Sequence, residues 1–154
     1  MILNNGNLLI IGLETLERIE IQYIPENLNL SRNASINEIG VIGRNTPLFQ
    51  HSGGSTDLTM NLDFHSVAES RTDVLKKVNW LRSLTYNDGF NRPAQKVKIV
   101  FGDIFRHELW VVKRVSANLS LFDPQFEYLP KQAYVTVTFG LDPQLNFTWN
   151  NLLR

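Results

Sequence analysis

The sequence predicts a mainly β domain in which a single α-helix packs on the sheet. Residues 56–64 alternate strictly between polar and apolar side chains, as in a strand with one buried face. Residues 71–87 instead repeat apolar side chains at helical spacing. Alternation returns in residues 96–101, 109–122 and 133–141. Because one helix stands among several strands, it must bury its apolar face against a sheet.

The composition is that of an ordinary soluble domain, and residues 1–154 are expected to form one domain. Apolar residues make up 43% and charged residues 19% of the chain. Fifteen basic and fifteen acidic side chains cancel, so the chain offers no general electrostatic attraction for nucleic acid or an anionic membrane. The absence of cysteine excludes disulfides, thiolate metal sites and cysteine nucleophiles.

The N-terminal third has the least regular pattern. The apolar run Leu8–Ile11 is too short to span a membrane, and no Lys or Arg precedes Arg18 as in a signal peptide. We interpret residues 1–15 as a strand or a partner-binding arm. A first strand is predicted from about Leu16 to Ile24, followed by a proline that ends it. Residues 26–55 are predicted to be polar and irregular.

The helix is predicted over about residues 71–87. Ser70 has the form of an N-cap with Asp73 at the third helical position. Asn87-Asp88-Gly89 is a typical helix stop. The face directed at the sheet is expected to hold Val74, Val78 and Leu81.

Two long strands are predicted after the helix and a shorter strand at 96–101. In residues 109–121, one face is predicted to carry Leu109, Val111, Val115, Ala117, Leu119 and Leu121. The strand 133–141 alternates in the same way, and the two could pair as a hairpin with a large surface. Because strand edges expose unpaired donors and acceptors, such a sheet must close into a barrel or join a neighbour's sheet.

Groups that carry chemistry are few and scattered. Asp63 and His65 share a face of the predicted strand, but two ligands do not make a zinc site. The glycine-rich Ser52–Ser55 lacks the lysine of a phosphate-binding loop, and no G-x-S-x-G elbow occurs. Trp149 stands in the tail 142–154, where contact with a partner and contact with its own subunit both stay open. We expect no enzyme, no cofactor and no metal site.

Four segments in a fixed order carry a family resemblance. They are VIGRNTPLFQHSGGSTDLTMNLDFHS (41–66), RTDVLKKVNWLRSLTYND (71–88), VKIVFGDIF (97–105) and SLFDPQFEYLPKQAYVTVTF (120–139). The combination resembles the tube-like proteins of contractile injection systems, which include the baseplate tube-initiator and hub-adaptor proteins of contractile-tailed phages. The resemblance covers roughly residues 19–140.

Two departures from the family are evident. Many relatives carry a second, LysM-like domain after the tube-like domain, whereas only some thirteen residues follow Leu141 here, so no such domain fits. Residues 1–18 have no counterpart that we can place.

The resemblance implies a tail-tube-like β-sandwich or barrel that assembles as a homo-hexameric ring around a lumen. It implies the hub or spike protein as one partner and the tail tube, or a second tube-initiator protein, as the other. The tape-measure protein and a baseplate wedge are further expected partners. DNA would pass through the lumen without sequence-specific binding, and no membrane is involved. The expected location is the tail baseplate of a virion, assembled in the host cytoplasm.

Candidate site residues follow from this implied assembly. The polar lumen face is predicted to hold Ser116, Asn118, Ser120, Thr136 and Thr138. Subunit and ring contacts are predicted in 1–15, 43–55, 89–95 and 142–154, at Leu8, Ile10, Arg44, Phe49, Phe90, Arg92, Phe147 and Trp149.

Three alternatives stay open besides a tube initiator or hub adaptor. A main tail tube protein, or the tube protein of a related secretion system, would polymerise by itself. A stand-alone module for a small ligand or glycan would need a pocket lined by aromatic side chains. An enzyme would need clustered groups with perturbed pKa values.

Overall fold

A computed structural model describes residues 7–66, 72–86, 94–106 and 108–142. Its elements, in order, are β1 (Leu9–Gly12), β2 (Arg18–Glu20), β3 (Leu28–Ile39), β4 (Leu48–His65), α1 (Asp73–Ser83), β5 (Lys96–Val100), β6 (Trp110–Asp123), the short 3₁₀ helix η1 (Pro124–Phe126) and β7 (Leu129–Leu141). The predicted mainly β class with one flanking α-helix is confirmed.

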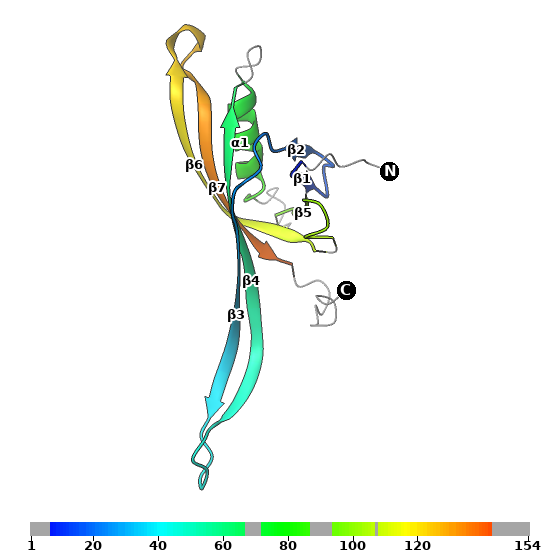
Figure 1. The fold of residues 1–154 in the computed structure, drawn as a ribbon, viewed down its shortest axis with the longest axis vertical. Helices are drawn as coiled ribbons and strands as arrows, with labels where there is room; N and C mark the ends of the chain where they lie inside the picture. Colours follow the sequence, from blue (N-terminus) through cyan, green and yellow to red (C-terminus); the bar gives the residue numbers. More distant parts are fainter. Residues whose placement is uncertain (1–6, 67–71, 87–93, 107, 143–154) are drawn as a thin grey trace.

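The strands form one seven-stranded antiparallel sheet in the order β2-β1-β5-β6-β7-β4-β3. The hairpin of β3 and β4 extends to one end of the elongated molecule and the hairpin of β6 and β7 to the other, while β1, β2 and β5 are short and lie to one side of them (Figure 1). The residues after β2 return to the end of β4, where the His65 amide donates to Gln22 Oε1 at 2.9 Å. The Tyr23 ring meets the His65 ring edge-on at 5.3 Å. Side-chain contacts therefore hold the segment after β2 against the end of β4.

The hydrophobic core lies between α1 and one face of this sheet. Leu58, Met60, Leu62 and Phe64 of β4 are buried and pair with Phe139, Val137, Val135 and Ala133 of β7. The helix contributes Val74, Val78 and Leu81, and its C-cap residue Leu84 is buried beside them. The apolar faces predicted for residues 56–64 and for the helix are both buried, so both predictions are confirmed. They could be made because a face that is buried along its whole length has apolar residues at a regular spacing in the sequence.

The start of α1 differs from the prediction. The helix begins at Asp73, and its N-cap is Thr72 without a side-chain capping bond, so the assignment of the cap to Ser70 was wrong. Ser70 itself lies outside the described residues. Tertiary packing of the apolar face, rather than a capping box, therefore stabilises this end of the helix.

Of the two readings of residues 1–15, a strand or a partner-binding arm, the structure shows a strand, β1, at Leu9–Gly12. Ile10 pairs with Ile19 of β2 on one side and with Ile99 of β5 on the other. Leu8 and Ile10 are completely buried. The expectation that these two side chains meet a neighbouring subunit is corrected, because they belong to the core of their own subunit.

The largest correction concerns residues 26–55, which form most of a long β-hairpin. β3 pairs with β4 from Leu28↔Met60 to Ile39↔Leu48. The side chains of β3 after Leu28, and those of β4 before Thr56, are exposed on both faces. A strand with no buried face has no apolar alternation, so hydrophobic periodicity could not reveal it.

A bulge in β6 changes the predicted phase of that strand. The register with β7 shifts between Val112 and Arg114, because Lys113 is an additional residue. Trp110 and Val112 therefore face the core before the bulge, and Val115 and Leu119 pack against it afterwards. The prediction that Leu109 and Val111 share the face of Val115 was wrong.

The side chain of Lys113 on β6 passes over Gly140 of β7 and reaches the carboxylate of Asp57 on β4. Its amine lies 2.9 Å from Asp57 Oδ1. A Cβ at Gly140 would stand 2.8 Å from Lys113 Cδ. The glycine thus leaves room for an ion pair that bridges β6 and β4 across β7.

Candidate assembly surfaces

The sheet face opposite the core is polar across three strands. Directly opposed residues of an antiparallel ladder share a face. The registers give four such rows, which are Thr59–Thr138–Arg114, Asn61–Thr136–Ser116, Asp63–Tyr134–Asn118 and His65–Gln132–Ser120. All five residues predicted for the lumen face therefore lie together on this surface, which we call the polar face. Its role as a lumen stays a prediction.

The polar face includes residues of β4 that the sequence reasoning did not assign to the lumen. Thr136 Oγ1 donates to Asn61 Oδ1 at 2.9 Å, and the hydroxyls of Thr59 and Thr138 lie 3.4 Å apart. The alternation of residues 56–64 marked the polar side of this strand. Only the pairing of β4 with β7 shows that this side continues the same surface.

Asp63 and His65 share a face as predicted, and they contact each other. His65 Nε2 lies 3.0 Å from Asp63 Oδ2, and Gln132 Nε2 lies 3.5 Å from the same ring nitrogen. Within the described ranges, no group of three or more His, Asp or Glu side chains could hold a metal ion. The geometry is that of a hydrogen-bonded surface pair.

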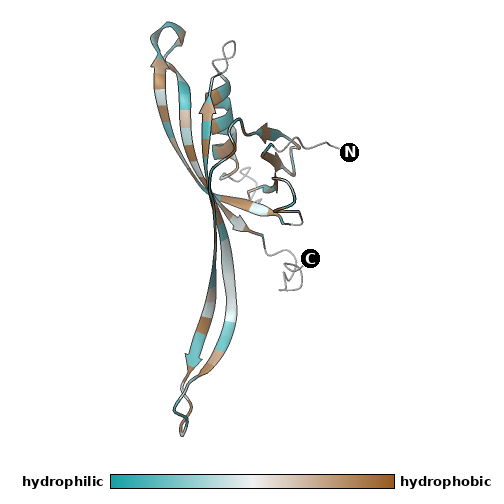
Figure 2. Cartoon of the chain, viewed as in Figure 1, coloured by the Kyte–Doolittle hydropathy of each residue, from teal (hydrophilic) through white to brown (hydrophobic). Residues whose placement is uncertain are grey.

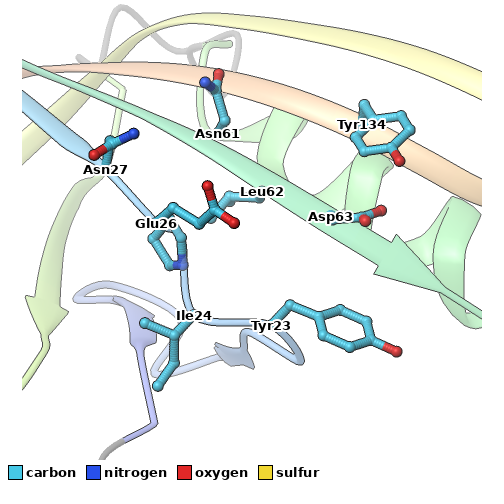
Figure 3. A pocket seen from close by; sticks show the side chains of 9 residues that line it. Tyr23, Ile24, Glu26, Asn27, Asn61, Leu62, Asp63 and Tyr134 are labelled. Atoms are coloured by element: carbon cyan, nitrogen blue, oxygen red, sulfur yellow. The ribbon is translucent and has the colours of Figure 1, made fainter.

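A recess of about 480 Å³ adjoins this end of the polar face. Figure 3 shows its lining side chains, which come from the connection between β2 and β3 on one side and from β4 and β7 on the other. Residues 23–27 form the first side, with Asn61, Asp63 and Tyr134 among those of the second. The connection thus runs beside the last residues of β4, where β3 does not reach.

The part of the β3–β4 hairpin that precedes residue 57 extends away from the body of the molecule as an arm (Figure 1). The ladder between β4 and β7 ends at Asp57↔Gly140, so residues 48–56 of β4 pair with β3 alone. A two-stranded hairpin without a core is only marginally stable in water. We call residues 30–56 the distal arm, and its large exposed apolar side chains are Leu30, Ile36, Ile39, Val41, Ile42, Leu48 and Phe49.

A second bulge sets the faces of the distal arm. The register shifts between Ala34 and Ile36, where Gly53 has a φ of 109°. The additional residue in β4 places Phe49, opposite Glu38, on the same face as Ile36. The other face continues the polar face, with Asn29, Ser31, Asn33, Ser35 and Asn37 at every second position of β3.

Replacing Gly54 by alanine is expected to loosen the distal arm without changing global stability. A Cβ at Gly54 would stand 2.5 Å from the carbonyl oxygen of Asn33, so the ladder must open there. Hydrogen exchange should accelerate for amides of the distal arm, while the melting temperature should stay the same because no arm side chain is buried. Gly40→Ala, with open space around its Cβ, is the control. Equal exchange in the two variants would contradict the close approach.

The predicted contact residues have separate outcomes. Phe49 is 68% exposed in the distal arm, and Arg44 lies in its turn, where the Arg44 amide donates to the Val41 carbonyl at 3.2 Å. Phe90, Arg92, Phe147 and Trp149 lie outside the described residues. The structure thus leaves Arg44 and Phe49 available at the surface, and their partner stays a prediction.

Other groups of interest are used inside the subunit. Trp110 is buried against Phe105 in an edge-on contact of 5.7 Å, and Trp80 Nε1 donates to Glu17 Oε2 at 2.6 Å. Both tryptophans therefore belong to the core or its border, as predicted. Burial raises the pKa of the carboxyl of Glu108, a residue that lies just before β6. In the part of the chain described, no helix is both long and apolar enough to span a membrane.

Comparison with solved structures finds a likeness to a virion protein, whereas comparison by sequence finds none. No protein-family model and no curated protein matches the sequence. A chain in the structure titled "Virion of native gene transfer agent (GTA) particle" is 13% identical and has a TM-score of 0.48. The likeness covers 94% of this chain and 98% of that chain. At this score it does not define a family for the protein.

Proposed function

We propose that the chain is a structural ring subunit of a phage-tail-like virion. The observation that carries the proposal is a polar face bounded by two free strand edges. β3 is an edge strand over Leu28–Ile39. β6 pairs with β5 only at Val111 and Trp110, so no described strand lies beside it from Lys113 to Asp123.

These two edges can complete each other in neighbouring copies. Free edges expose unpaired backbone donors and acceptors, which favour addition of another strand. β6 and β3 run in opposite directions within the sheet, so β6 of one copy beside β3 of the next would form an antiparallel pair like the others. A contact between two different surfaces generates a closed ring when its rotation closes.

The ring would enclose the polar face. Four long strands from each of six subunits would make a barrel of roughly 24 strands, which is wide enough for an aqueous channel. Hydroxyl and amide side chains would line that channel and α1 would lie outside it. DNA could pass without being held, because tight phosphate binding needs many Lys and Arg contacts.

The finer role that we propose is that of tube initiator or hub adaptor in a contractile tail baseplate. The ring would join the hub and spike to the tail tube, with the tape-measure protein passing through it. This role rests on the resemblance of residues 19–140, and it adds no catalytic step.

A main tail tube protein is the second candidate. Exposed apolar side chains at both ends of the long axis favour a subunit that stacks on its own kind. Electron microscopy of the purified chain separates the two, because a main tube protein would form long tubes alone. An initiator would form single rings until its hub is added.

Labelling of a single cysteine tests the ring. The chain has no cysteine, so Ser116→Cys places one thiol on the polar face and Lys76→Cys places one on the exposed side of α1. In assembled rings, we expect Ser116→Cys to react with a small maleimide and to react at least tenfold more slowly with a maleimide on a large polymer. Lys76→Cys should react with both reagents. Equal access of the polymer to both thiols would place the polar face outside and overturn the proposal.

A further inference from the structure

The loop end of the β6–β7 hairpin is a second exposed apolar surface, and hydrogen bonds connect its two sides. Asp123 organises it, because its side chain accepts from the Gln125 amide at 3.1 Å and its carbonyl accepts from the Tyr128 amide at 3.0 Å. Lys131 Nζ adds an ion pair to Asp123 Oδ2 at 3.2 Å. We call residues 121–128 the tip.

The tip presents large apolar side chains to solvent. Leu121 is 62%, Phe122 is 54% and Tyr128 is 68% exposed. Leu121 and Tyr128 are held at positive φ values of 56° and 57°, a conformation that residues with a Cβ rarely adopt. Aromatic side chains that are exposed on an ordered loop are typical of contact hot spots.

The tip and the distal arm lie at opposite ends of the long axis of the molecule (Figure 1). Figure 2 shows hydrophobic segments at both ends. Two such surfaces on one elongated chain cannot cover each other within a subunit. Copies arranged head to tail along this axis bring the tip of one against the distal arm of the next.

We infer that the tip of a subunit in one ring binds the distal arm of a subunit in the adjacent ring. The arm contributes Leu30, Ile36 and Phe49, which are all more than half exposed. Charge agrees with this partner, since the tip carries Glu127 and the turn of the arm carries Arg44. The inference rests on the proposed ring, in the form of the second candidate, a main tube protein whose identical rings stack, and it identifies the surfaces that would join two such rings.

The size of the two surfaces determines when they associate. A half-exposed large apolar side chain offers roughly 100 Å² for burial. Three on each side therefore bury about 600 Å² per contact, whereas a stable interface needs about 1,200 Å² or more. Six contacts formed together between two rings exceed that threshold several-fold. Single subunits should thus not join through this contact, and rings should.

Disulfide trapping tests the contact. In the cysteine-free chain, Gln125→Cys marks the tip and Ile42→Cys marks the turn of the arm. The two purified variants are mixed in equal amounts under conditions where the wild type forms rings, and are then oxidised. We expect the mixed 42–125 dimer to exceed both symmetric dimers at least fivefold. Symmetric dimers in equal or greater amount, or no dimer, would overturn the inference.

A surface variant separates stacking from ring formation. Phe122→Ser combined with Tyr128→Ser should leave rings intact in electron micrographs and reduce stacked rings at least tenfold. The matched control changes Tyr86 and Ile104 to serine, since these side chains are 66% and 60% exposed outside both surfaces. Normal stacking by the tip variant overturns the contact alone. Wild-type rings that stay single and never stack overturn the contact and leave the proposed ring function standing. Failure of the wild type to form any ring contradicts the proposed function, and the contact with it.

Discussion

Removing the distal arm is expected to give a folded subunit that forms no rings. Residues 32–56 are replaced by Asn-Gly, which joins Ser31 to its ladder partner Asp57 through a two-residue turn. The deleted segment contains no fully buried side chain, so the core between α1 and the sheet stays complete. Most of the free edge of β3 is lost, and with it the strand that a neighbour would pair with.

Circular dichroism and analytical ultracentrifugation measure the two parts of this result. The melting temperature should stay within a few degrees of the wild type, and sedimentation should show only monomer. The control replaces residues 40–47 by Asn-Gly between the paired residues Ile39 and Leu48, which removes the turn and keeps both strands. This shorter deletion should still form rings. Unfolding of the long deletion, or rings formed by it, would contradict the proposed use of β3.

Two phenylalanines of the same strand are expected to respond oppositely to truncation. Phe64 is completely buried against the helix, with Lys77 Nζ 5.6 Å from its ring centre, while Phe49 is 68% exposed. Phe64→Ala should lower the free energy of unfolding by about 3–5 kcal/mol, because it removes buried contacts and leaves a cavity. Phe49→Ala should change that free energy by less than about 0.5 kcal/mol in the monomer.

Urea denaturation of monomer at low protein concentration checks both values. Phe49→Ala should also reduce stacked rings in micrographs, because Phe49 belongs to the arm surface that meets the tip. A loss of several kcal/mol from Phe49→Ala would show that the distal arm packs within its own subunit. Little change from Phe64→Ala would show that the end of β4 is outside the core.

The parts of the fold that bury one face could be predicted from the sequence. Residues 56–64, the face of α1 and strand β7 follow the expected periods, because each presents one row of apolar side chains to the same core. The lumen residues share a face in the structure for a related reason. Their polar side chains alternate with the buried residues of β7 and with Val115 and Leu119 of β6, which are partly buried against the core.

The parts that failed lack such a buried row or break its period. Residues 29–39 and 48–55 pair through backbone bonds with both faces exposed, so their Asn and Ser residues resemble a loop. The bulges at Lys113 and Gly53 each shift a strand by one residue, and no local pattern marks that shift. Leu8 and Ile10 could belong to an arm or a strand, and the sheet places them between β2 and β5.

The sequence by itself determined which segments bury one face, and hence the mainly β class and the single helix. The spacing of apolar residues that shows a buried face can be read within each segment alone. Only the tertiary structure decided the neighbours of each strand. It thereby showed which polar residues share a surface, that no described strand covers the outer edge of β3 or most of the edge of β6, and that the arm and the tip lie at opposite ends. These features depend on register and on pairing between distant segments, which hydrogen bonds and long-range packing set and composition does not encode.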